Sequence, residues 1–274
     1  MLKTRVITAL VLLVVFLAAL FWLPPLAWAA FSGLLVIPAA WEWAKLIKLQ
    51  PGTCGLYVLV VCAICAAFFG LPEIGFGTGA MRLQLFAGAS LFWILVVPVW
   101  LWRSRLPRGR WSGALTGLLV LVPMWLALVE LHKFGPLMLL MLMAVAWISD
   151  SAAYFAGRSF GRRKLAPSIS PGKTWEGVAG AALAVSVYGA IWIVFWQAYF
   201  PQALQSARFG GFGLVLFLWL LTAVGIYGDL FESALKRQAG VKDSGVLLPG
   251  HGGVLDRIDA LTSVLPVAAM VCLL

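Results

Sequence analysis

The chain of 274 residues is 63% hydrophobic and only 11% charged, and it carries a formal net charge of +10. A soluble domain has about a quarter charged residues and roughly half apolar ones, so the composition excludes a water-soluble protein and predicts an all-α, polytopic integral membrane protein. Nucleic-acid binding is also disfavoured, because no soluble domain is left to present the basic residues.

Apolar segments of about 20 residues, the length that crosses the hydrocarbon core, follow one another along the chain. They predict about nine transmembrane helices. The first has a basic start but is longer than the apolar core of a signal peptide, so we expect it to be retained. It lies so close to the second that the pair can instead form a re-entrant hairpin. The expected spans are Val6–Leu23, Leu26–Ala44, Cys54–Leu71, Leu83–Leu101, Ala114–Leu131, Phe134–Ala156, Trp175–Tyr199, Phe212–Leu235 and Val254–Leu274.

Basic residues are unevenly divided between the segments that join these spans. Most of the 20 Lys and Arg lie in the N-terminus and in the even-numbered loops. The positive-inside rule then places the N-terminus and these loops in the cytoplasm and the C-terminus outside. We expect a multi-pass protein of the cell inner (plasma) membrane whose basic loops also meet anionic lipid headgroups.

The chain divides into two regions by the distribution of its acidic residues. Residues 1–133 form N-terminal transmembrane helices without an assigned role, open to use as a homodimer surface or as a lipid entry path. Residues 134–274 form a C-terminal transmembrane region that we expect to be catalytic. Seven of the ten acidic residues fall there: Asp150, Glu176, Asp229, Glu232, Asp243, Asp256 and Asp259.

Five of these acids are placed to meet at one membrane face. Asp150 ends the sixth span, Asp229 and Glu232 lie three residues apart late in the eighth, and Asp256 and Asp259 repeat that spacing at the start of the ninth. Residues three apart share a helix face, and carboxylates beside membrane spans face a polar cavity or pair with a cation. Together they predict a site for a hard divalent cation.

Each acid taken alone also has a structural explanation. Asp256 can complement the dipole of the helix that it opens, and Glu232 can pair with Lys236 one turn later. Glu42 and Glu130 lie outside the acidic cluster, and the sequence assigns them no role.

Three connecting segments have the composition of phosphate-binding loops. Ser170–Gly177 combines hydroxyls, a lysine and free backbone N–H groups at a helix start, where anions bind readily. Gly157–Lys164 is basic but lacks the ending of a Walker loop. Pro249–Gly253 is glycine-rich, which lets the backbone approach a ligand closely, and its His251 can donate to a phosphate or transfer a proton.

The stretch Ser233–Asp259, SALKRQAGVKDSGVLLPGHGGVLDRID, resembles the defining motif of the phosphatidate cytidylyltransferases, the membrane CDP-diacylglycerol synthases. Segments around Asp150, Ser170–Gly177 and Gly228–Ser233 are also similar to that family. The resemblance implies an all-helical membrane enzyme that converts CTP and phosphatidate into CDP-diacylglycerol and pyrophosphate. It further implies Mg²⁺ as cofactor, with room for a second cation in the same centre.

The motif and the charge pattern together assign roles to individual residues. We expect Asp229, Asp256 and Asp150 to hold the metal. The catalytic set is Asp229, Asp256, Lys242, Asp243 and His251. The substrate-binding set is Ser170, Lys173, Thr174, Ser233, Lys236, Arg237, Gly252, Gly253, Arg257 and Asp259.

Two other functions share part of this pattern. A CTP-dependent membrane kinase of a polyprenol or phytol would transfer the γ-phosphate and release CDP. An ion-coupled transporter also carries membrane carboxylates, but its acids are expected near the midplane of broken helices. The complete His251-Gly252-Gly253 motif favours the cytidylyltransferase, and the clustering of acids at one face disfavours transport.

Overall fold

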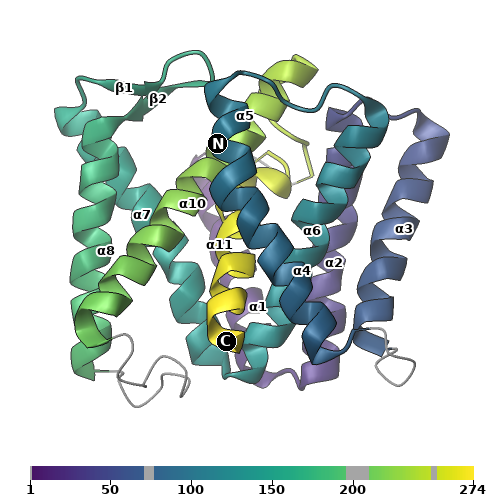
Figure 1. The fold of residues 1–274 in the computed structure, drawn as a ribbon, viewed down its shortest axis with the longest axis horizontal. Helices are drawn as coiled ribbons and strands as arrows, with labels where there is room; N and C mark the ends of the chain where they lie inside the picture. Colours follow the sequence, from purple (N-terminus) through teal and green to yellow (C-terminus); the bar gives the residue numbers. More distant parts are fainter. Residues whose placement is uncertain (1, 71–76, 196–209, 248–251) are drawn as a thin grey trace.

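The computed structural model describes residues 2–70, 77–195, 210–247 and 252–274, and these residues are mostly helical (Figure 1). The elements are α1 (Leu2–Trp22), α2 (Pro25–Leu46), α3 (Pro51–Gly70), α4 (Gly79–Leu91), the π-helical turn η2 (Phe92–Val96), α5 (Val97–Trp102), α6 (Arg110–Lys133), α7 (Pro136–Phe160), β1 (Lys164–Ala166), β2 (Ser170–Thr174), α8 (Trp175–Phe195), α10 (Gly210–Ala239) and α11 (Leu255–Leu273).

Each expected span corresponds to a helical segment, and α4, η2 and α5 form one continuous rod. Seven of the helices in the described residues are long and apolar enough to cross a membrane: α2, α3, the α4–α5 rod, α6, α7, α8 and α10. The all-α polytopic architecture is therefore confirmed, and the expected count of nine is approximate. α1 and α2 are two separate helices, and Leu23 and Pro24 join them.

Proline sets the start of several spans. Pro25, Pro51 and Pro136 each stand at the first position of their helix. Proline suits that position because its fixed φ is already helical and its missing N–H would have no partner there. Helices are the natural solution for these apolar segments, because each satisfies its own backbone polar groups where water is absent.

The C-terminal helix packs inside the bundle instead of at its edge. α11 contacts α10 on one side and α6 and α4 of the N-terminal region on the other. Gly228 of α10 faces α11, where an added Cβ would lie 2.6 Å from Ser263 Oγ and 2.7 Å from the carbonyl oxygen of Asp259. Small residues at such crossings let membrane helices approach closely, and here the approach brings the neighbouring Asp229 beside the start of α11.

A short hairpin between α7 and α8 was not expected from the sequence. β1 and β2 pair antiparallel, with Lys164 opposite Thr174 and Ala166 opposite Ser170. Two strands this short carry almost no periodicity, and their pairing depends on the helices that hold them, so the sequence alone predicts only a loop here. Figure 1 shows the hairpin at the same end of the bundle as the end of α10.

Candidate active site

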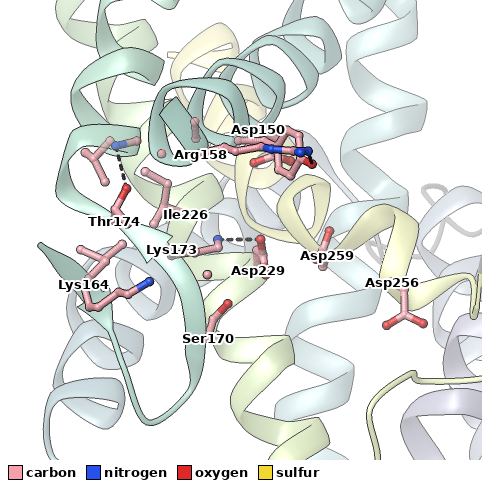
Figure 2. Close-up of a pocket in the computed structure, with 17 residues that line it drawn as sticks. Asp150, Arg158, Lys164, Ser170, Lys173, Thr174, Ile226, Asp229, Asp256 and Asp259 are labelled. Carbon is pink, nitrogen blue, oxygen red and sulfur yellow. Dashed lines mark hydrogen bonds and ion pairs between the residues drawn. The ribbon is translucent and has the colours of Figure 1, made fainter. Parts of the chain in front are cut away.

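A cavity of about 590 Å³ opens among α7, the β hairpin, α10 and the start of α11. Four carboxylates and three cationic side chains line it (Figure 2). Its charged and hydroxyl-bearing lining residues are Asp150, Tyr154, Arg158, Lys164, Ser170, Lys173, Thr174, Asp229, Asp256 and Asp259. The structure therefore brings together residues that are up to 109 positions apart, from Asp150 to Asp259, at one end of the bundle.

Asp229 faces the cavity and is held by the hairpin. The ammonium of Lys173, on β2, lies 2.5 Å from Asp229 Oδ2, as the dashed line in Figure 2 marks. The hydroxyl of Ser233, one turn further along α10, donates to Asp229 Oδ1 at 3.2 Å. Both side chains of the ion pair are about a quarter exposed, 23% for Lys173 and 27% for Asp229, so solvent and ligands can reach this carboxylate.

Asp256 is more firmly bonded. Its Oδ2 accepts the backbone N–H of Ser244 at 3.0 Å, the Ser244 hydroxyl at 3.0 Å and the backbone N–H of Gly253 at 2.8 Å. Its Oδ1 accepts the Lys236 ammonium at 2.5 Å. Gly252 has φ +85°, a conformation that favours glycine, and this turn points the Gly253 N–H at the carboxylate.

Glu232 does not line the cavity, which corrects the expectation that five carboxylates meet there. It is 4% exposed and lies 2.5 Å from the ammonium of Lys236, four residues later on α10. The alternative structural explanation of Glu232 therefore holds. Lys236 contacts both Glu232 and Asp256, so one cation joins a carboxylate outside the cavity to one that lines it.

The predicted phosphate segment is divided between cavity lining and helix capping. Ser170 and Lys173 line the cavity, and so does Thr174, whose Oγ1 accepts the Gly177 N–H at 3.1 Å in the first turn of α8. Glu176 lies outside the cavity and accepts the backbone N–H groups of Arg162 and Arg163, which fixes the entry into the hairpin.

Other predicted site residues lie elsewhere. Lys242, Asp243, Arg237 and Arg257 are exposed and are not among the cavity-lining side chains. His251 falls outside the described residues.

Some cavity residues were absent from the predicted site. Tyr154, Arg158 and Lys164 line the cavity. The signal for the two cations was present in the basic segment Gly157–Lys164, but a basic loop is also what membrane orientation alone produces. Tyr154 lies in the segment around Asp150 that resembles the family, but its position in the cavity depends on the packing of α7 against the hairpin.

The cavity lining carries the donor atoms that a divalent cation needs. Its four carboxylates are hard oxygen donors of the type that Mg²⁺ prefers, and they outnumber the three cationic side chains that line the cavity. In the part of the chain that the structure describes, no three His, Cys, Asp or Glu side chains are grouped to hold a metal ion as they stand. The donor chemistry fits Mg²⁺, and a dication would compete with Lys173 for Asp229.

Comparisons with known proteins identify the family of the chain. The sequence matches the cytidylyltransferase family over residues 3–274. A phosphatidate cytidylyltransferase of Pseudomonas aeruginosa is 42% identical over 278 residues, covering 98% of this chain and 96% of that protein. Similar proteins of the same name occur in Haemophilus influenzae, 34% identical over 97% of this chain and 96% of theirs, and in Brucella suis, 38% identical over 96% and 90%. Because the family match extends over nearly the whole chain, this protein belongs to the cytidylyltransferase family.

Proposed function

We propose that this cavity transfers the cytidylyl group of CTP to phosphatidate, giving CDP-diacylglycerol and pyrophosphate for phospholipid synthesis. The observation that carries the proposal is the convergence of four aspartates and three basic side chains in one cavity of a membrane-embedded cytidylyltransferase. The full-length relatives named phosphatidate cytidylyltransferase support the choice of lipid.

The chain's own residues are suited to a reaction between two anions. A phosphatidate oxygen is already ionised, so its attack on the α-phosphorus of CTP needs little help from a base. The bond from that phosphorus to the pyrophosphate oxygen breaks as the new one forms. Catalysis is then mainly positioning and charge neutralisation. Arg158, Lys164 and Lys173 are the cavity cations that can neutralise phosphate oxygens, and Ser170 can donate a hydrogen bond to them.

The cavity aspartates carry the negative charge that can hold a metal cation. We propose that Asp150, Asp229 and Asp256 hold Mg²⁺, with Asp259 beside them and room for a second cation. Bound there, the ion would neutralise phosphate charge and polarise the phosphorus–oxygen bonds. Lys236 and the Ser244 and Gly253 N–H groups would keep Asp256 oriented.

The location of the cavity suits substrates that arrive from different phases. CTP is soluble, whereas phosphatidate keeps its acyl chains in the bilayer. We propose that the hairpin end of the bundle faces the cytoplasm at the inner membrane, with the N-terminus inside and the C-terminus outside, as the basic loops favour. Exposed apolar side chains on α3 and α8, such as Leu59 and Leu183, would contact lipid.

The test is a product analysis with purified protein in lipid–detergent micelles. Phosphatidate and labelled CTP with Mg²⁺ should give labelled lipid and one pyrophosphate per turnover, and chelation of the metal should stop both. Release of CDP with a phosphorylated alcohol would instead identify the CTP-dependent kinase. Absence of nucleotide turnover with either acceptor would reject the proposal.

A further inference from the structure

Glu42, a buried residue of α2, contacts the loop that carries the family motif. Glu42 is only 4% exposed. Oε1 accepts the Val254 N–H at 3.0 Å, and Oε2 accepts the Leu255 N–H at 2.9 Å and the Ser244 hydroxyl at 3.0 Å. These partners are more than 200 positions away in the sequence. All are neutral donors, and two are the first free N–H groups of α11, where a carboxylate also complements the helix dipole.

Two glycines of the motif region leave room for this carboxylate. A Cβ at Gly245 would lie 2.7 Å from Glu42 Cδ, and a Cβ at Gly253 would lie 2.5 Å from Glu42 Oε2. Real Cβ atoms do not approach other atoms this closely, so any larger residue at either position would move the carboxylate or the loop. The last glycine of the His-Gly-Gly sequence is therefore explained by its close packing against Ser244 and Glu42, independently of any contact with substrate.

The contact extends to the active-site cavity through one hydroxyl. Ser244 Oγ lies 3.0 Å from Glu42 Oε2 and 3.0 Å from Asp256 Oδ2. The two carboxylates share a single hydroxyl proton, so they fix the Ser244 side chain between them. Glu42 thus contacts two segments that precede Asp256 in the chain, the Ser244 side chain and the backbone of residues 254–255, without lining the cavity itself.

We propose that Glu42 is a positioning residue for the cytidylyl transfer: it holds the motif loop (the described residues 240–247 and 252–254 between α10 and α11) against α2 and thereby keeps Asp256 in its catalytic orientation. The proposal rests on the function proposed above for the cavity. Groups that orient a metal-binding side chain, the role proposed for Asp256, change metal affinity or activity by about 10- to 100-fold when they are removed.

The critical variant is Glu42→Gln. Glutamine has the same shape but only one acceptor oxygen, so its amide NH₂ must face at least one of the two backbone N–H groups. The chain offers a matched control in Glu130→Gln. Glu130 is similarly buried at 6% but pairs with Arg82 at 2.6 Å and Lys133 at 2.8 Å, and it does not line the cavity.

We expect Glu42→Gln to lower kcat about 10- to 100-fold, while Glu130→Gln leaves kcat unchanged even if its melting temperature falls as far. Hydrogen exchange of the peptides spanning residues 244–247 and 252–256 should rise in Glu42→Gln and not in Glu130→Gln. Equal loss of activity in the two variants, or full activity of folded Glu42→Gln, would overturn the proposal.

Ser244→Ala gives a second route that remains usable if Glu42→Gln fails to fold. It keeps the Ser244 N–H bond to Asp256 and removes only the shared hydroxyl. We expect a smaller fall in kcat, and a double variant that loses less than the product of the two single losses, because the residues act through one contact. Unchanged kcat in Ser244→Ala, or strictly multiplicative losses, would contradict the inference. An inactive wild-type protein would instead count against the proposed function.

Discussion

Asp229 and Asp256 both line the cavity, but the protein holds them in different ways. Asp229 pairs with Lys173 across a contact in which the two side chains are 27% and 23% exposed. Asp256 pairs with Lys236 where the exposures are 7% and 13%, and it accepts three further hydrogen bonds from Ser244 and Gly253. The first carboxylate is open to exchange its partner for a ligand. The Asp256 carboxylate also holds α10, α11 and the motif loop together.

The difference follows from where each partner lies. Lys173 comes from a two-stranded hairpin at the end of the bundle, whereas Lys236 lies on α10, close to Glu232 as well as Asp256. Exposed ion pairs contribute little stability, but removing one partner of a buried pair leaves an uncompensated charge. The two regions should therefore respond differently to the same substitution.

The substitution Lys236→Met should have the largest effect, a loss of stability. It leaves Glu232 and Asp256 without their shared cation, and breaking a buried pair costs about 3–5 kcal/mol, whereas Lys173→Met should cost about 1 kcal/mol or less. Thermal unfolding in detergent should show a much lower Tm for Lys236→Met than for Lys173→Met. Adding Glu232→Gln should recover part of the loss. Equal Tm values in the two single variants would remove the distinction between the regions.

Next in size is the comparison of Asp256→Asn with Asp229→Asn. Both should lower kcat by about 10²- to 10³-fold, the range for removal of one preorganised electrostatic group. Only Asp256→Asn should also lower Tm, because its amide cannot accept all the donors that surround the carboxylate. Pyrophosphate release and thermal unfolding of both variants check this. Full activity of Asp256→Asn would exclude that residue from the catalytic centre.

The smallest expected effect is on Gly253→Ala. The new methyl group would press on Glu42 Oε2 and on the backbone nitrogen of Gly245, and overpacking of this kind costs about 1–3 kcal/mol. Gly88→Ala on α4 is the control, because an added Cβ there meets nothing within 4 Å. Gly253→Ala should lower both Tm and turnover, and Gly88→Ala neither. A neutral Gly253→Ala would mean that the loop can move away from α2 freely.

The membrane class and the succession of helices could be predicted from the sequence alone, and so could the part of the chain that lines the cavity. Length and apolar composition are local properties, so the spans could be read directly. The spacing of Asp229, Asp256 and Asp259 late in one helix and early in another predicted their convergence, because both helix ends reach the same face. The structure places these three in one cavity with Asp150.

Which acids face that cavity and which stabilise the helix packing became clear from the folded structure. Glu232 shares the spacing of its neighbours but pairs with Lys236, and Glu42 carries no local signal at all. The hairpin that supplies Lys173 is too short to have a readable period. Each of these outcomes depends on contacts between segments far apart in the chain. Such contacts are set by how the helices pack, and helix packing cannot be read from the residue types and spacing within one segment.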